Sequence, residues 1–304
     1  MIYWNYLITI YLFSAGVSAG AMFISITAGF INPVKYERIV RTGAYIAPFP
    51  IMAGMAGLIL DLERPWQFWR LMTTIELKSV MSLGAWIIAL FTVVSIIYFI
   101  LNLPKNYLRL KTRGNVIKAV MLLGLILSTG VALYTGILLS TLTARPFWNT
   151  PMIPMLLFIS AILDGLAGIS LALYLKPSGG GERAVLETEE EINNNKSFIN
   201  TVDFALLFLL ILSVVVFIIG LGGSTESAVS ALGIIVGGKY TALFWFGFVA
   251  LGVAIPFAAT AYELFNQNHR AWLNAMSASF ALIGGYVVRS VIVNAGQLTQ
   301  AVLY

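Results

Sequence analysis

The sequence contains no cysteine, and this absence excludes several kinds of redox chemistry within the chain. Disulfides, cysteine-ligated iron–sulfur clusters and thiol catalysis all need a sulfur atom that the chain does not supply. The one histidine, His269, lies in a predicted loop. A b-type haem held between two helices needs two intramembrane histidines, so we expect no haem and no iron–sulfur cluster in this chain. Any redox role must therefore use a diffusible or externally supplied electron carrier.

Charged residues are also scarce: they make up 10% of the 304 residues, whereas hydrophobic residues make up 59%. With a mean hydropathy of +0.90, the chain is far too apolar for a soluble domain, whose charged fraction is about a quarter. Its apolar runs reach the roughly 20 residues that a spanning helix needs, and the short alternating segments of an outer-membrane barrel are absent. The sequence thus predicts an all-α integral membrane protein in a lipid bilayer.

Eight apolar segments are long enough to be transmembrane helices. They cover residues 5–31, 43–60, 79–101, 116–140, 151–175, 201–221, 241–265 and 272–295. The first segment lacks the basic leading region of a cleaved signal, so we take it as the first span. We expect two four-helix bundles. The predicted divisions are an N-terminal bundle with the ligand site at residues 1–175, a glycine- and glutamate-rich cytoplasmic linker at 176–200, and a C-terminal bundle at 201–304.

The basic residues indicate how the helices are oriented in the cytoplasmic membrane. The connections after the odd-numbered segments carry twelve Lys and Arg residues, whereas those after the second, fourth and sixth segments carry five. Positive charge favours the cytoplasmic side, so both termini and the even-numbered connections are expected outside. The sequence pI of about 9.4 reflects this distribution and does not indicate a nucleic-acid partner.

Two of the outer connections have a common pattern, in which Arg-Pro is followed by aromatic residues that include tryptophan. They read "DLERPWQFWR" (61–70) and "TARPFWNTP" (143–151). Tryptophan is enriched at membrane interfaces and arginine extends its charge to the headgroups, so membrane anchoring explains much of the pattern. Anchoring does not explain Asp61 and Glu63, because carboxylates contribute little to it.

Few ionisable residues lie within the predicted spans. Asp164 is in the fifth and Arg289 in the eighth, where a charge is costly unless it faces a partner or a water-filled cavity. Two interpretations stay open for Asp164: a structural ion pair or protonated carboxyl, and a functional group. Asp203 and Glu263 are near the cytoplasmic ends of their segments, where we expect exposure to water.

Two tyrosines are predicted at matching depths. Tyr134 lies roughly 10 Å below the outer end of the fourth segment, and Tyr11 lies at about the same depth in the first. Both could direct a phenol at one site, and core packing is the alternative for each. A quinone suits such a place, because it has two carbonyl groups, a long apolar tail and a two-proton reaction that needs protonatable neighbours. Asp61 and Glu63 meet the last requirement.

Four stretches together resemble the NrfD-like family, of which the membrane subunit of polysulfide reductase is the best-known type. They are "YLFSAGVSAG", "DLERPWQFW", "ALYTGILLSTLTARPFWN" and "GGYVVRSVIVNAGQ". The resemblance covers nearly the whole chain and implies eight spans with extracytoplasmic termini. It also implies a quinone-reactive anchor that exchanges electrons between menaquinol and a four-cluster iron–sulfur subunit. That subunit would serve a molybdopterin enzyme, most simply a sulfur-compound reductase, on the extracytoplasmic face.

The resemblance assigns roles by position. Tyr134 matches the family's quinone-contacting tyrosine, and Tyr11 stands where the polysulfide reductase type has a histidine, which puts the protonation chemistry there in question. Glu63 matches an acidic residue proposed for proton transfer, and Asp61 belongs to the commoner form of the same motif. Arg64, beside these carboxylates, is a further quinone-binding candidate.

Two other roles follow from the resemblance. Asp164 and Arg289 become candidates for a proton route through the membrane. Tryptophan and arginine are favoured in interface cores, so the docking candidates for the partner are the outer residues Trp66, Trp69, Arg145 and Trp148. A dimer of such complexes is left open.

Two other functions are compatible with the same residues. A secondary transporter would use Asp164 and Arg289 as substrate or proton groups, and it would have discontinuous helices at matching places in its two halves. A purely structural anchor would bind no quinone, and replacing Tyr134 with phenylalanine would then leave quinol-dependent activity intact.

Overall fold

The structure is a computed structural model that describes residues 4–60, 65–67, 76, 79–103, 114–175, 189–266 and 271–299. All secondary structure in these ranges is helical, and eight helices are long and apolar enough to cross a membrane, which confirms the predicted fold class. In sequence order the elements are α1 (Tyr6–Ile31), α2 (Glu37–Ile46), α3 (Pro48–Leu60), η1 (Pro65–Gln67), α5 (Val80–Leu101), α6 (Gly114–Ser140), α7 (Met152–Leu175), α8 (Glu189–Gly222), α9 (Glu226–Gly233), η3 (Leu243–Ala254), α10 (Ile255–Asn266) and α11 (Ala271–Leu298).

Two spans begin earlier than the sequence predicts. The second combines α2 and α3 over Glu37–Leu60; α3 starts at Pro48, where the missing N–H of proline costs a helix nothing. The sixth begins at Asn194, within helix α8, which starts at Glu189, so residues 189–200 of the expected linker are helical. Residues 176–188, the rest of that expected linker, lie outside the described ranges.

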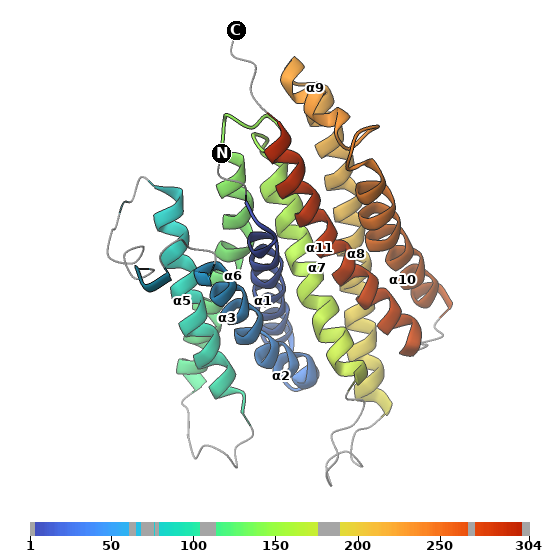
Figure 1. The fold of residues 1–304 in the computed structure, drawn as a ribbon. Helices are drawn as coiled ribbons and strands as arrows, with labels where there is room; N and C mark the ends of the chain where they lie inside the picture. Colours follow the sequence, from blue (N-terminus) through green and yellow to red (C-terminus); the bar gives the residue numbers. More distant parts are fainter. Residues whose placement is uncertain are drawn as a thin grey trace.

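Helix α1 is at the centre of the molecule, between α3 and α6 on one side and α7 and α11 on the other (Figure 1). Its closest approach is to α7, where Gly20 and Gly165 bring the two backbones together. A Cβ atom at Gly20 would overlap the carbonyl group of Ala161, and one at Gly165 would overlap the backbone of Gly20 and Ala21. Small residues thus allow α1 to contact both halves of the protein.

The two largest clusters of buried hydrophobic residues divide the spans into two groups. One cluster draws mainly on α1, α3, α5 and α6, and the other mainly on α7, α8, η3 and α11; Ala161 and Val293 join the first, and Leu139 joins the second. Because five of the eight spans precede the polar connection after Leu175, a division into four and four falls between α6 and α7 and not at that connection. The two-bundle arrangement itself stays a prediction.

Large hydrophobic side chains also cover the outside of the helices. Examples are Val93 on α5, Leu212 on α8 and Phe246 on η3, all of which are exposed. Soluble monomers rarely expose such apolar surface over whole helices. We therefore assign these faces to contact with lipid.

Candidate functional site

The first group of helices contains the two tyrosines that the sequence predicts to share a site. Tyr11 of α1 and Tyr134 of α6 are 6% and 8% exposed and belong to the same hydrophobic cluster. Their phenols are close enough to interact electrostatically. The structure therefore brings both rings into one buried region between α1, α3, α5 and α6.

Glycines on the neighbouring helices leave room for the two rings. A Cβ atom at Gly84 of α5 would overlap the ring and hydroxyl of Tyr134. At Gly54 of α3 a Cβ atom would lie 3.3 Å from the Cα of Tyr11 and 3.0 Å from the Cβ of Ser14. Gly84 and Gly54 are thus parts of the site that sequence reasoning missed.

The hydroxyls of Tyr11 and Tyr134 make no hydrogen bond to any residue in the described part of the protein. Tyr98, a third buried tyrosine in the same cluster, differs: its hydroxyl lies 2.9 Å from Oγ of Ser25. A phenol hydroxyl can donate one hydrogen bond, and these two donate none to the described residues. The region between Tyr11 and Tyr134 therefore offers two phenol donors to an acceptor that enters it.

An ion pair lies at the junction of α1, α7 and α11. Asp164 and Arg289 are 0% and 2% exposed, and Arg289 Nη1 lies 2.6 Å from Asp164 Oδ2. The same nitrogen donates to the carbonyl oxygen of Gly285 at 2.7 Å and to Ser160 Oγ at 3.2 Å. Asp164 Oδ1 has no hydrogen-bond partner among the described residues, so one carboxylate oxygen is left available.

Glycines also make space for this ion pair. A Cβ atom at Gly16 of α1 would overlap the guanidinium of Arg289, and one at Gly285 of α11 would overlap the carboxylate of Asp164. Gly16 follows Tyr11 by five residues, which is a rise of about 7.5 Å along α1. The pair thus lies beside the same central helix as Tyr11, farther from the N-terminus of α1 than the tyrosine.

The expectation of exposure to water is wrong for Glu263, whereas Asp203 is half-buried. Glu263 is fully buried and accepts a hydrogen bond from Asn200 Nδ2 at 2.8 Å, while Thr260 Oγ1 donates to Asp203 Oδ2 at 2.6 Å. The cause is the packing of α10 against α8, which turns these polar faces inward. The spacing of the two polar pairs, three residues apart on each helix, could have indicated it.

The predicted docking residues differ strongly in exposure. Trp66 in η1 is 91% exposed, whereas Trp148 is 3% exposed and donates from Nε1 to the carbonyl oxygen of Ile292 at 2.7 Å. The Trp148 ring also packs on Trp4, with centroids 5.2 Å apart. Trp148 is therefore an internal packing residue of this protein and is not available to a partner's surface.

Arg145 is half-buried and joins the same region. Its Nη1 donates to the carbonyl oxygens of Gln297 at 2.7 Å and Thr299 at 2.5 Å. The Gln297 side chain in turn exchanges two hydrogen bonds with the backbone of Trp4. Arg145 thus fastens the connection between α6 and α7 to the end of α11.

Four of the predicted site residues, Asp61, Glu63, Arg64 and Trp69, lie outside the described residues.

The comparison with protein families decides the classification. The family described as "Polysulphide reductase, NrfD" matches residues 1–301. The chain belongs to the NrfD family. Together with the eight apolar helices, NrfD membership shows that it is a multi-pass membrane protein.

Proteins similar to this NrfD-family member include two that are named as parts of reductases. The sequence is 30% identical to "Protein NrfD" of Escherichia coli, over 98% of this protein and 96% of that one. It is also 30% identical to the C chain of polysulfide reductase from Wolinella succinogenes, over 97% and 94% of the two proteins. The C subunit of selenate reductase from Mesobacillus selenatarsenatis is 24% identical, over 83% of this protein and 65% of that one.

Proposed function

We propose that this protein is the quinone-reactive membrane subunit of a respiratory reductase complex, and that it exchanges electrons between menaquinol and an iron–sulfur subunit. The observation that carries the proposal is the pair of buried phenols, Tyr11 and Tyr134, without hydrogen-bond partners among the described residues. The names of two similar proteins, one from a polysulfide reductase and one from a selenate reductase, support the assignment to a reductase.

The residues present fit a quinone headgroup. Two phenols can donate to two carbonyl oxygens, and Gly84 and Gly54 let α5 and α3 pack closely against the two tyrosines. The surrounding cluster is apolar and suits an isoprenoid tail. A bound quinone would supply the two-electron, two-proton chemistry; Tyr134 and Tyr11 would hold and orient it through their hydroxyl groups.

We assign proton exchange at this site to the outer carboxylates. Glu63 and Asp61 follow the end of α3, in the connection that the charge distribution places outside. Arg64 would contribute to quinone binding from the same segment. Asp164 and Arg289 belong to a polar route deeper in the membrane, for which the unpaired Oδ1 of Asp164 is the supporting observation.

The iron–sulfur subunit is proposed to dock on the outer face, where it would pass electrons to a molybdopterin subunit that reduces a sulfur compound. Trp66 is the best-placed contact, because it is almost fully exposed, and Trp69 follows it by three residues in the sequence. Arg145 would act indirectly, by holding the neighbouring connection in place. Tryptophan anchors of this kind commonly dominate interfaces.

The transporter alternative has less support. Arg289 donates to Asp164, Ser160 and Gly285, so the pair already satisfies much of its own hydrogen bonding. The helix break at Pro48 lies within the second span, between α2 and α3, whereas the π-helical stretch η3 forms the first half of the seventh. These irregularities do not occupy matching places in the two halves.

Because the sequence has no cysteine, the orientation of the protein can be tested with single introduced cysteines. Asn149 and Lys35 are both exposed, in connections that the charge distribution places outside and inside. We expect a membrane-impermeant maleimide to label Asn149→Cys in intact spheroplasts and to label Lys35→Cys only after the membrane is opened. If Lys35→Cys were labelled in intact spheroplasts and Asn149→Cys were not, the proposed quinone site and docking face would lie on the cytoplasmic side, and the proposed orientation would be wrong.

The assignment of Glu63 can be tested in the assembled complex. General acid–base groups contribute about 100-fold or more to a rate, so Glu63→Gln should lower quinol-driven acceptor reduction by about that factor. Reduction of the same acceptor by a soluble dye, which bypasses this subunit, should not change. Glu76→Gln, in the same connection, is the matched control. Unchanged quinol turnover in Glu63→Gln would remove this residue from the proton route.

A further inference from the structure

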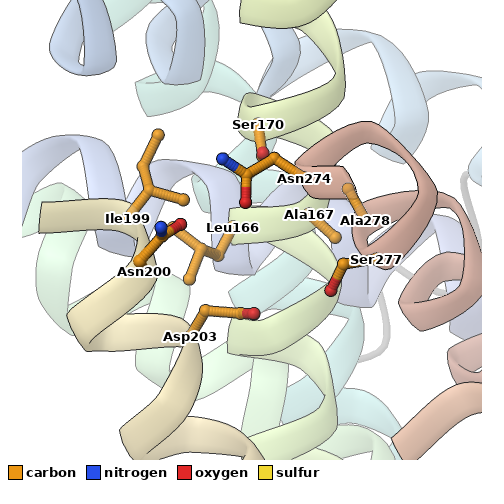
Figure 2. Close-up of a pocket in the computed structure, with 9 residues that line it drawn as sticks. All are labelled: Leu166, Ala167, Ser170, Ile199, Asn200, Asp203, Asn274, Ser277 and Ala278. Atoms are coloured by element: carbon orange, nitrogen blue, oxygen red, sulfur yellow. The ribbon is translucent and has the colours of Figure 1, made fainter. Parts of the chain in front are cut away.

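A small polar pocket lies between α7, α8 and α11, apart from the tyrosines (Figure 2). It has room for about one water molecule. Its polar lining consists of Ser170, Asn200, Asp203, Asn274 and Ser277. These five polar side chains lie near the ends of their spans, around a space that is small enough to hold a single bound species.

Several of these side chains lack partners within the protein. Ser277 is 4% exposed, and its hydroxyl makes no hydrogen bond to any described residue. The same holds for the side chains of Ser170 and Asn274. Figure 2 shows the Ser277 hydroxyl and the Asp203 carboxylate directed toward one another from α11 and α8. Asp203 Oδ2 already accepts from Thr260, but the Ser277 hydroxyl has no such partner, and buried polar groups are normally hydrogen-bonded, so the space between the two side chains points to a bound species.

The charges around the pocket favour a positive species. Glu263 is close enough to Asp203 to interact electrostatically, and two carboxylates in apolar surroundings repel one another. On α11, Arg289 is engaged with Asp164 of α7, and on α8 the nearest basic residue is Lys196. No basic residue in the described part of the protein forms an ion pair with Asp203.

We propose that this pocket binds one small cation, either a sodium ion with Asp203 and the Ser277 hydroxyl as ligands or a proton taken up by the Asp203 carboxylate beside the Ser277 hydroxyl. The lining offers oxygen ligands and no sulfur or imidazole, which is the ligand type that hard cations prefer. Ser170 follows Asp164 by six residues, or about 9 Å along α7. The site thus lies beyond the ion pair, toward the ends of α7 and α11 that lead into the odd-numbered connections. The proposal does not rest on quinone binding.

The purified full-length protein in detergent can test the site and distinguish the two cations. In the sodium arm, thermal unfolding is followed by tryptophan fluorescence while NaCl replaces choline chloride at constant ionic strength and pH. In the proton arm, infrared spectra without sodium are recorded against pH to detect the carbonyl band of a protonated carboxyl group. A ligand that binds the folded state raises the unfolding temperature as its concentration increases.

For sodium, we expect the unfolding temperature to rise with NaCl concentration. In Ser277→Ala about tenfold or more sodium should be needed for the same rise, and in Asp203→Asn the rise should disappear. For a proton, we expect no sodium effect and a titrating carboxyl band that disappears in Asp203→Asn and moves in Ser277→Ala. Ser279→Ala is the control, because this hydroxyl bonds to the Ala275 carbonyl within α11. Ser277→Ala keeps the test valid if Asp203→Asn does not fold. The proposal would be overturned if the wild type showed neither effect. It would also be overturned if the observed effect were unchanged in Ser277→Ala.

Discussion

Asparagine in place of Asp164 is expected to lower the free energy of unfolding by about 3–5 kcal/mol, because it leaves a buried charge without its partner. Arg289 is 2% exposed and bonds to Asp164 at 2.6 Å. A guanidinium does not give up its proton in a protein, so the charge would remain after the carboxylate is gone. Chemical unfolding of the detergent-solubilised protein, followed by tryptophan fluorescence, measures the loss.

Substitution of the other member of the ion pair, Arg289, provides the control for this result. Arg289→Met should destabilise less than Asp164→Asn, because a buried carboxyl can take up a proton and become neutral. The double variant Asp164→Leu with Arg289→Met removes both charges and should recover most of the stability. If Asp164→Asn is as stable as the wild type, the two groups are not an ion pair in the membrane.

Phenylalanine in place of Tyr134 is expected to reduce quinol turnover by about 10- to 100-fold, the equivalent of one lost hydrogen bond in a buried site. The ring remains, so the fold and the reduction of the acceptor by a soluble dye should not change. Tyr98→Phe is the matched control, since this buried tyrosine already bonds to Ser25. Quinol kinetics of the assembled complex measure the difference.

A second substitution tests the position of the ring. Gly84→Ala adds a Cβ atom where the Tyr134 ring lies, so the ring must move although its hydroxyl is retained. We expect the Michaelis constant for quinol to rise while dye-linked activity stays normal. If Tyr134→Phe and Tyr98→Phe behave alike, the phenol of Tyr134 does not contact the quinone.

The spans could be predicted from the sequence because apolar length is a local property. Each of the eight segments corresponds to a helix, and the two tyrosines expected at one depth share a cluster. The predicted boundaries are less accurate, since Glu37 and Glu189 begin helices in polar sequence. A helix can extend beyond the hydrocarbon region, and hydropathy does not detect such an extension.

Contacts between helices could not be predicted in the same way. The rotation of each helix decides whether a polar residue faces a neighbour, which is why Glu263 is buried against Asn200 and not exposed. The preference of tryptophan for interfaces predicts Trp148 at the surface, yet Gly296 on α11 leaves room for its indole. Gly84 gives no signal, because a glycine in an apolar helix shows nothing of the ring that packs against it.

The central claim is that quinone binds between α1 and α6, and photolabelling tests it most directly. The purified protein would be illuminated with a photoreactive menaquinone analogue and the labelled peptides mapped by mass spectrometry. We predict label on the peptides that contain Tyr11 and Tyr134, reduced by excess menaquinone and by Tyr134→Phe but not by Tyr98→Phe. Label confined to α8, α10 and α11, or label that menaquinone does not displace, would contradict the account.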